Sequence, residues 1–418
     1  MGRRVRNLAA IAGLVATGIL AAGLLVVVVN RNSTAAPASS PSGAGAPQAY
    51  TQVQWHATKV QASSSLSPYL AVSNGRLYMV TDDRQGDSRG LQLWSSADAI
   101  HWEQATDLGV DPDFVARAAT ADGRGGLIVV GELTPTDAAV VPQIWHSTDG
   151  KTFARARVEP PGPGSAPGTS SGEIVAVATA AGQMVAFGGH NIVDMTKGAP
   201  EVRGLDSWHS TDGSTWTHSD LAGSDGYQAT SMTAWSGGFA ALATESGKDS
   251  GYGVWLSSDG VAWHNAASVP AITALSIMAL PRGLVVVGGK QDATRGMAPA
   301  AWSSSDGATW SEAIASGTGL AVMFDGAIVV GHSVVAVALS HMGVGTGTGG
   351  SASQSPSLPA PVPPSTWILN DGWTWQPLGA APAFWPYWAS MTTFNGHVVV
   401  ATVSGAAEVT VSVGDLSS

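Results

Sequence analysis

Seven ionisable side chains stand where runs of apolar residues end, and their types and placement could support chemistry. Carboxylates, imidazoles and an amine can hold a polar ligand through charge and hydrogen bonds, and two carboxylates across a cleft could hydrolyse a glycosidic bond. The chain has 30 acidic residues, so spacing alone singles out no such pair. The candidate ligand-binding residues are Asp82, Asp83, Glu132, His190, Glu245, Lys290 and His341.

The sequence contains no recognisable signature of a catalytic, metal or cofactor site. It has no Cys, which removes thiolate nucleophiles and sulfur ligands for zinc. The ten His form no H-E-x-x-H pattern, and His146 and His209 occupy one column of a repeat, where packing or turn support explains them. Asp111 and Asp113 lack the other ligands of a calcium loop. We therefore predict no catalytic residue, no metal and no cofactor.

The charge of the chain excludes one class of partner. Its 19 basic and 30 acidic residues give a formal charge of −11, and the first 31 residues hold four Arg and no acid, so the remainder carries 15 − 30 = −15. Such an acidic body does not bind a phosphate backbone by counterion release, so nucleic acid is not an expected partner. The 52 Gly and 16 Trp among a 44% apolar set are typical of a folded, turn-rich β protein.

The N-terminal region predicts export. Residues 8–29 are 22 residues without a charge, and as a helix they would span about 33 Å, enough to cross a bilayer. Three Arg precede this span and one follows it, which favours a cytoplasmic N-terminus. We expect a signal anchor over 1–31 and a disordered tether over 32–49, with single-pass attachment to the cell membrane and the remainder outside. Cleavage between Ser33 and Ala38 would instead release a secreted protein.

A nine-residue pattern, W-x-S-x-D-G-x-x-W, occurs six times with small variations. Its two aromatic columns contain 11 of the 16 Trp. Trp and the Ser two residues later share one face of a strand, and Asp-Gly is a tight-turn signal, so each copy predicts a β-hairpin. The Ser and Asp are expected to be structural. They are Ser96, Asp98, Ser147, Asp149, Ser210, Asp212, Ser257, Asp259, Ser304, Asp306 and Asp371.

A second repeated pattern precedes each hairpin and predicts two further strands. An alternating strand, a Gly turn and an apolar strand recur, for example at 272–280 with 284–287. Together the repeats make a four-stranded unit. Two insertions, expected to be disordered, lengthen the interval between copies near 160–172 and 343–364, and without them the period is roughly 47–50 residues, the length of a propeller blade. The sequence predicts an all-β fold, a β-propeller of four-stranded blades over 50–418.

The number of blades follows from the two ends of the repeat. After the sixth hairpin, 387–393, 397–403 and 408–413 supply three more strands and no hairpin. Residues 54–58 resemble the strand that follows the first hairpin, 101–106. A seventh blade completed by this N-terminal strand would leave no free sheet edge. We favour seven blades over six and expect a monomer.

The nine-residue pattern resembles the Asp-box, or BNR, repeat of sialidase-like β-propellers. That family usually reads S-x-D-x-G-x-x-W, and the turn here is one residue shorter, as in 210–216. The resemblance implies the fold; the family includes sialidases, other glycosidases, sorting-receptor ectodomains and assembly factors. The F-R-I-P signature of its sialidases is absent. Tyr227, Tyr252 and Glu245 lie in one blade, where a nucleophile pair or ordinary packing could explain them.

These observations lead to one functional expectation and two alternatives. We expect an exported, membrane-tethered propeller that acts as a non-catalytic binding scaffold for a glycan or an envelope protein. The candidate residues named first would form a polar ring at the rim opposite the hairpins, although charge at strand ends that meet water is an ordinary alternative. A sialidase-like or other glycoside hydrolase is the alternative from the enzyme class. A structural role in envelope assembly is the third reading.

Overall fold

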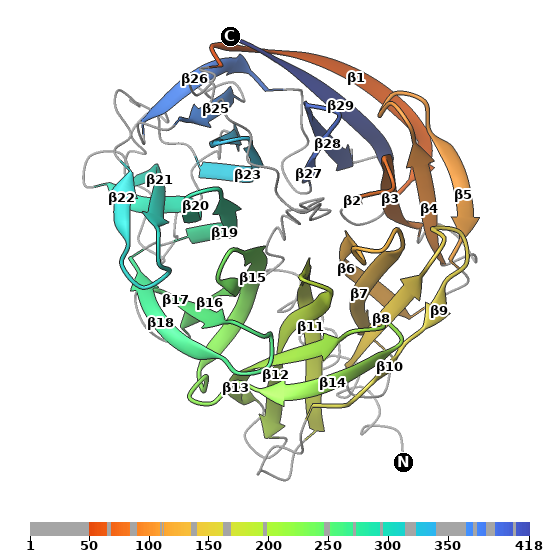
Figure 1. The fold of residues 1–418 in the computed structure, drawn as a ribbon, viewed down its shortest axis with the longest axis vertical. Helices are drawn as coiled ribbons and strands as arrows, with labels where there is room; N and C mark the ends of the chain where they lie inside the picture. The colour runs from red at the N-terminus through yellow and green to blue at the C-terminus, as the bar shows by residue number, and fades with distance from the viewer. Residues whose placement is uncertain are drawn as a thin grey trace, which may run out of the picture.

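The computed structural model is a closed ring of seven sheets, which confirms the all-β, seven-bladed propeller (Figure 1). All described strand pairs are antiparallel except β10 (Arg157–Val158) with β14 (Thr215–Asp220) at the edge of one blade. All regular elements of the described residues are strands. The structure describes residues 50–64, 68–83, 90–108, 111, 113–134, 140–161, 169–194, 199–245, 251–270, 273–292, 296–313, 323–339, 365–370, 374–381, 389–403 and 407–418.

The blades follow the chain around the ring. Blade 1 contains β2 (Tyr69–Ser73), β3 (Arg76–Asp83), β4 (Gly90–Ser96) and β5 (Glu103–Asp107), and blade 2 contains β6 (Phe114–Ala121), β7 (Leu127–Leu133), β8 (Val141–Ser147) and β9 (Ala154–Arg155). Blade 3 contains β11 (Thr169–Ala180), β12 (Gln183–Asp194), β13 (Ala199–Ser210) and β14 (Thr215–Asp220), with β10 (Arg157–Val158) at its outer edge. Blade 4 contains β15 (Tyr227–Trp235), β16 (Gly238–Glu245), β17 (Tyr252–Ser257) and β18 (His264–Val269).

The last three blades continue the same order. Blade 5 contains β19 (Thr273–Leu280), β20 (Gly283–Asp292), β21 (Gly296–Ser304) and β22 (Ser311–Ala313), and blade 6 contains β23 (Met323–Val330), β24 (Ser333–Leu339), β25 (Ser365–Leu369) and β26 (Trp375–Ala380). Blade 7 contains β27 (Ala389–Phe394), β28 (His397–Val403), β29 (Glu408–Ser417) and β1 (Gln52–Ser63). In every blade the first of the three or four consecutive strands lies nearest the centre of the ring (Figure 1).

The N-terminal strand closes the ring, as the sequence predicts. β1 pairs antiparallel with β29, with Trp55 opposite Gly414. The two faces of β1 pack against different neighbouring blades because side chains alternate along a strand. Val53 packs in the cluster between blades 6 and 7, and Val60 packs in the cluster between blades 7 and 1. Trp55 Nε1 also donates a hydrogen bond of 3.3 Å to Thr366 in blade 6.

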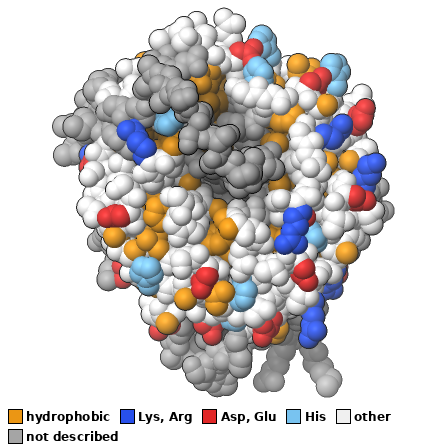
Figure 2. Space-filling view, viewed as in Figure 1, with side chains coloured by type: hydrophobic (Ala, Val, Ile, Leu, Met, Phe, Trp, Pro, Cys, Tyr) orange, Lys and Arg blue, Asp and Glu red, His pale blue; other side chains and the backbone are white. Residues whose placement is uncertain are grey.

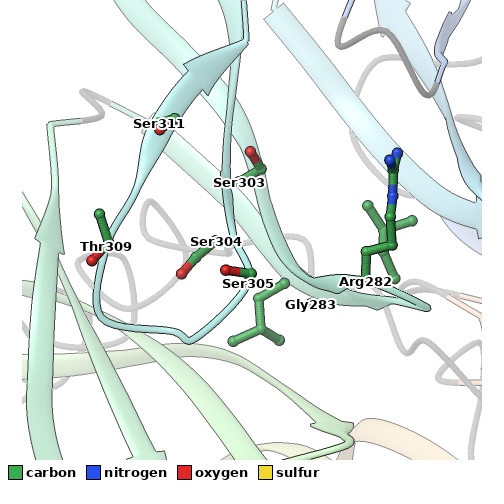
Figure 3. A pocket seen from close by; sticks show the side chains of 9 residues that line it. Arg282, Gly283, Ser303, Ser304, Ser305, Thr309 and Ser311 are labelled. Carbon is green, nitrogen blue, oxygen red and sulfur yellow. The ribbon is translucent and has the colours of Figure 1, made fainter.

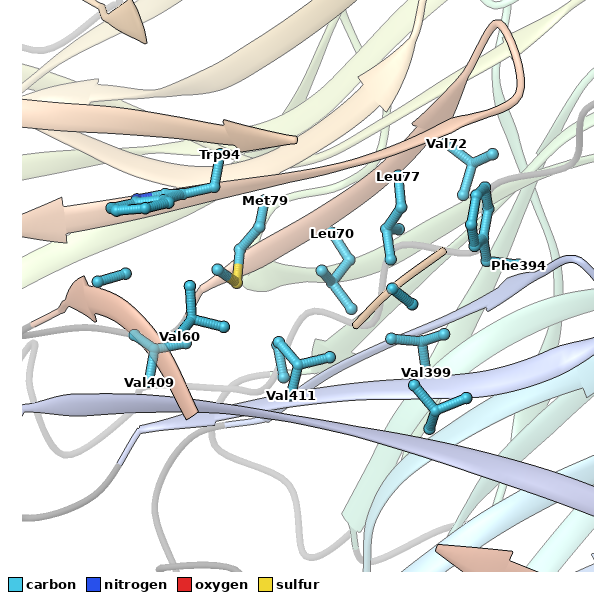
Figure 4. Packing of buried hydrophobic residues seen from close by; sticks show 14 of the residues in the cluster. Val60, Leu70, Val72, Leu77, Met79, Trp94, Phe394, Val399, Val409 and Val411 are labelled. Carbon is cyan, nitrogen blue, oxygen red and sulfur yellow. The ribbon is translucent and has the colours of Figure 1, made fainter. Parts of the chain in front are cut away.

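The hydrophobic core lies between the blades and not along the axis. Seven clusters of buried side chains occur, and each is made by two neighbouring blades. In the cluster between blades 7 and 1, Leu70 and Met79 of blade 1 face Val399 and Val411 of blade 7 (Figure 4). The paired faces explain why both sides of the inner strands are apolar in the sequence.

Two rims of the ring differ in their connections. The turns between third and fourth strands, which contain the repeated Asp-Gly, lie at one rim, called here the hairpin rim. The second strands end at the opposite rim, called here the loop rim, because neighbouring strands of each blade are antiparallel. Any ligand-binding loops between second and third strands therefore belong to the loop rim.

The repeated Gly of the hairpins serves both the turn and the contact between blades. Gly213 and Gly260 have φ of 77° and 76°, in the left-handed region that L residues disfavour. A Cβ on Gly213 would lie 2.6 Å from the ring of His146 in blade 2, and one on Gly260 would lie 2.2 Å from Val185 Cγ2 in blade 3. His146 Nε2 also lies 3.1 Å from Asp122 Oδ2, whose other oxygen accepts the amides of a turn. Packing and turn support thus both explain His146.

Several predicted segments lie wholly or partly outside the described residues. The predicted signal anchor 1–31 and the tether 32–49 lie outside them, and so do all of the insertion near 343–364 and residues 162–168 of the insertion near 160–172. Residues 169–172 belong to β11 and pair with β12, so the described strand begins inside the predicted insertion. Within the described ranges, no helix is long and apolar enough to cross a bilayer.

Candidate functional site

The structure places five of the seven candidate residues on second strands, toward the loop rim. They are Asp82 of β3, Glu132 of β7, His190 of β12, Glu245 of β16 and Lys290 of β20. Two of them lie short of the strand ends, because β12 continues past His190 to Asp194 and β20 continues past Lys290 to Asp292. Asp83 is the last residue of β3, and its side chain is outside the description. His341 lies outside the described residues.

Among the candidates whose side chains are described, three are paired locally and do not form a continuous ring of polar groups. Lys290 donates to Glu312 on the outer strand of its own blade. His190 Nδ1 lies 2.8 Å from Asp206 on the adjoining strand of blade 3, and Glu132 is paired within blade 2. On the face of the ring drawn in Figure 2, the visible charged side chains are spread around the ring. The loop rim therefore contains separate local groups, two of which have organised geometry.

The first group, called here the axial cluster, is built around a buried ion pair in blade 2. Arg117 Nε and Nη2 both donate to Glu132 Oε1, at 2.7 and 2.6 Å. The Glu132 side chain is 3% exposed and that of Arg117 is 29% exposed. Arg117 is the extra residue of a β-bulge in the innermost strand β6, between Ala116 and Ala118. Bulges redirect a side chain from the regular alternation of a strand, and this one orients Arg117 toward Glu132.

Electrostatics connect this pair to the neighbouring blades. Burial raises the pKa of Tyr69 to about 12, with Arg117 opposing that rise and Glu132 and Asp82 adding to it. Burial alone would lower the pKa of Arg117, but the charge and hydrogen bond of Glu132 outweigh burial and raise it. Glu173 of β11 contributes in the same direction. We define the axial cluster as Tyr69, Asp82, Arg117, Glu132 and Glu173.

The axial cluster offers charged and hydrogen-bonding groups suited to recognition, and its tyrosine is not activated as a nucleophile. An activated nucleophile needs a lowered pKa or an adjacent base, whereas the pKa of Tyr69 is raised. Asp82 and Glu132 are 5% and 2% exposed, so neither carboxylate can approach a substrate in this conformation. Arg117 and Glu173 are the partly exposed members. The cluster carries one positive and three negative formal charges, which disfavours an anionic ligand.

The second group, called here the blade-3 cluster, consists of His190, Asp206, His218 and Asp220. The buried carboxylate of Asp206 has one imidazole on each oxygen, with His190 Nδ1 2.8 Å from Oδ2 and His218 Nε2 2.8 Å from Oδ1. Burial would raise the pKa of Asp206, but the two histidines outweigh burial and lower it. The hydrogen bond to Asp206 raises the pKa of His190.

The blade-3 cluster also contains the one group of potential metal ligands found within the described residues. Single ligand atoms of Asp206, His218 and Asp220 lie within 4.8 Å of one another. The sequence predicts no metal, and only the spacing of two of these three residues indicates that they could lie together. His218 and Asp220 share a strand face through their spacing of two, but Asp206 reaches them only through the pairing of β13 with β14.

The tyrosines considered for a nucleophile pair are occupied by packing. The Tyr227 ring lies edge-on to Trp255 with centroids 5.5 Å apart, and its hydroxyl accepts a hydrogen bond from Asn265. Tyr252 is 4% exposed. Their arrangement supports the packing alternative that the sequence left open.

The repeated Ser and Asp of the hairpins bind their own turn. In the copy at 208–216, Asp212 Oδ1 accepts backbone N–H groups of Ser214 and Thr215 at 2.8 and 2.9 Å and the hydroxyl of Ser210 at 3.1 Å. The copies containing Asp98, Asp149, Asp259 and Asp306 repeat these contacts. Asp371 lies outside the described residues.

Removal of a turn carboxylate should lower stability and leave the loop rim intact. Because Asp212 satisfies two amides that would otherwise need water, Asp212→Ala is expected to lower the free energy of unfolding by about 1 kcal/mol. Asp259→Ala should cost a similar amount, and the double variant should show the sum because the turns share no partner. Urea denaturation measures this, with the exposed Asp225→Ala as a control near zero. A double variant no less stable than Asp225→Ala would contradict the turn-capping role.

The same contacts predict a dependence on acid. Backbone hydrogen bonds, first from Thr215, lower the pKa of Asp212 from 3.8 to about 2. A lowered pKa in the folded state means that the contribution is complete above the unfolded value and is lost as the pH falls through the folded value. The stability difference between wild type and Asp212→Ala should therefore be constant above about pH 5 and shrink between about pH 4 and pH 2. Denaturation curves at these pH values check it; a difference that grows on acidification would contradict it.

One pocket of about 310 Å³ lies on the opposite side from the predicted residues. It is formed at the hairpin rim of blade 5 by Arg282, Ser303, Ser305 and Thr309, among others (Figure 3). Ser304, which also lines it, donates to Asp306 Oδ1 and accepts from the Gly307 amide. Part of the polar lining is thus already hydrogen-bonded within the hairpin turn.

Comparisons with known proteins give distant structural similarities and no family match. Comparison with family models and with curated protein sequences gives no match. Among solved structures, an ulvan lyase of a polysaccharide lyase family is 13% identical with a TM-score of 0.45, covering 65% of this chain and 75% of its own. The sialidase of Trypanosoma rangeli is 11% identical with a TM-score of 0.40, covering 84% and 55%. A chain of a mitotic checkpoint complex is 10% identical with a TM-score of 0.49, covering 92% and 99%.

Proposed function

We propose that this protein is an exported, membrane-tethered β-propeller that acts as a non-catalytic binding scaffold at the cell envelope, with its binding face at the loop rim. In this proposal the segment 8–29 is the membrane anchor and 32–49 is the tether. The partner is a neutral or basic glycan or an envelope protein, and the propeller is monomeric. The repeated hairpins are Asp-box turns that stabilise the opposite rim.

The axial cluster is the observation that supports this proposal most strongly. It brings charged residues of blades 1, 2 and 3 together on innermost strands and the strands beside them. Convergent polar groups near the mouth of a ring are a common setting for ligand binding. Its excess of carboxylates favours a partner that offers hydroxyls or positive charge over one that offers a carboxylate.

Two features argue against hydrolysis as the function of this face. The tyrosine of the cluster has a raised pKa, opposite to the requirement for a nucleophile. The guanidinium of Arg117 already donates from Nε and Nη2 to Glu132, so this arginine has fewer N–H groups for the carboxylate of a sialic acid. Within the described residues, no second arginine joins the axial cluster.

The test compares the ligand affinity and melting temperature of two variants, one on each rim. The full chain, purified in detergent, is applied to an array of neutral, basic and anionic glycans and is used to capture envelope proteins, and the affinity for any ligand found is then measured. Glu173→Gln, on the axial cluster, should weaken binding at least tenfold with little change in melting temperature. Asp259→Ala, on the hairpin rim, should lower the melting temperature and leave affinity unchanged. The reverse pattern, or turnover of a bound glycan, would contradict the proposal.

A further inference from the structure

The blade-3 cluster has the composition of a metal site and a position outside the axial cluster. Its members come from three neighbouring strands, β12, β13 and β14, whose pairing sets Asp206 opposite Asp220 and Trp208 opposite His218. Asp206 is fully buried, His218 is 8% exposed and Asp220 is 69% exposed. A carboxylate and an imidazole are thus held inside the blade, and a second carboxylate closes the group from the solvent side.

The distances are close to those of a small divalent ion site. His218 Nε2 lies 2.8 Å from Asp206 Oδ1 and 3.5 Å from Asp220 Oδ1. Zinc binds nitrogen and oxygen ligands at about 2.0–2.2 Å in tetrahedral geometry, which puts neighbouring ligand atoms about 3.3 Å apart. The two distances from His218 Nε2 are within about half an ångström of this value, and all three ligand atoms lie within 4.8 Å of one another. The exposed Asp220 carboxylate can move to close the site, and its solvent side leaves a fourth position for water.

We propose that the blade-3 cluster binds one divalent transition-metal ion of the zinc type through Asp206 Oδ1, His218 Nε2 and Asp220 Oδ1. Two carboxylates and a neutral imidazole balance the charge of the ion. Such a nitrogen and oxygen set suits zinc and its neighbours, whereas calcium takes six to eight oxygen ligands. The bound ion would fix the outer strand β14 to β13.

The surroundings of Asp206 and His218 hold these two ligands in place, as metal sites require. His190 occupies the second oxygen of Asp206 at 2.8 Å and so fixes the plane of that carboxylate. The His190 ring fits only because residue 204 is Gly, since a Cβ there would lie 2.6 Å from His190 Cε1. The His218 ring packs against Trp208, with centroids 5.4 Å apart.

The test uses Zn²⁺ itself on the full chain, purified in detergent without an affinity tag. Isothermal titration should show one saturable Zn²⁺ site per chain, with Ca²⁺ at least tenfold weaker. Asp220→Ala removes one ligand from an exposed position and leaves the buried Asp206–His218 pair intact, so the variant should fold normally without metal. It should bind Zn²⁺ at least tenfold more weakly, and Zn²⁺ should raise the melting temperature of the wild type more than that of the variant.

A matched control distinguishes this site from ordinary surface histidines. Asp415 also lies between two histidines, His56 at 3.4 Å and His397 at 2.5 Å, but all three side chains are about half exposed or more. His397→Gln should leave Zn²⁺ affinity and stoichiometry unchanged. Absence of a saturable site, equal affinity in Asp220→Ala and wild type, or loss of binding in His397→Gln would each overturn the proposal.

Discussion

Deletion of residues 50–62 is expected to open the propeller ring and to destabilise the protein severely. The deletion removes β1, which pairs with β29 and contributes Val53 and Val60 to two interfaces between blades. Burial of one valine contributes about 1.5–3 kcal/mol, so these two side chains alone account for about 3–6 kcal/mol. Aggregation is also expected, because β29 would become an exposed edge strand with apolar side chains.

The control for this deletion removes chain without removing a strand. A full-length protein lacking 33–48 should unfold at the same temperature and denaturant concentration as the wild type. Circular dichroism during heating and size-exclusion chromatography compare the three proteins. If the protein lacking 50–62 melts like the wild type and stays monomeric, closure by the N-terminal strand does not hold the ring together.

Glu132→Ala is expected to have the second large effect, a loss of about 3 kcal/mol in the free energy of unfolding. The reason is that Arg117 would keep its charge in a largely buried place without its carboxylate. Removing one partner of a buried ion pair costs more free energy than replacing both partners with apolar residues. Replacing both members, as in Arg117→Met with Glu132→Leu, should recover part of the loss. Urea denaturation of the single and double variants measures both values.

An exposed ion pair of the same protein provides the comparison. Lys290 and Glu312 are each 41% exposed, and exposed pairs contribute about 0–1 kcal/mol. Glu312→Ala should therefore change stability far less than Glu132→Ala. Equal losses in the two variants would show that the Arg117–Glu132 pair is not a buried structural contact.

Much of the fold could be predicted from the sequence because the propeller repeats its local signals. The repeated hairpins combine period-two alternation with an Asp-Gly turn, or Asp98-Ala99 in the first copy, and both signals act over a few residues. The seventh blade needed a different kind of inference, since β1 and β29 are separated by almost the whole chain. The similarity of residues 54–58 to an outer strand was sufficient to predict this pairing, because a ring that lacked one strand would have a free sheet edge.

The candidate sites were harder to predict because they depend on pairing between strands. Asp82, Glu132 and His190 could be predicted at the loop rim from strand ends alone, but their partners could not. Arg117 stands in an otherwise small and apolar strand, FVARAATA, and that exception was the available signal. The bulge that orients it has no distinct sequence pattern. Asp206 and His218 meet only through the register of β13 and β14.

Site-specific photo-cross-linking in cells tests the central claim, that the loop rim is the binding face, most directly. A photoreactive amino acid is placed singly at Thr134 or Lys290 on the loop rim and at Ser258 or Ser305 on the hairpin rim. These positions are exposed or partly exposed, so the protein should fold with each replacement. The account predicts cross-linked products from the two loop-rim positions and none from the two hairpin-rim positions. Products only from the hairpin rim would contradict it.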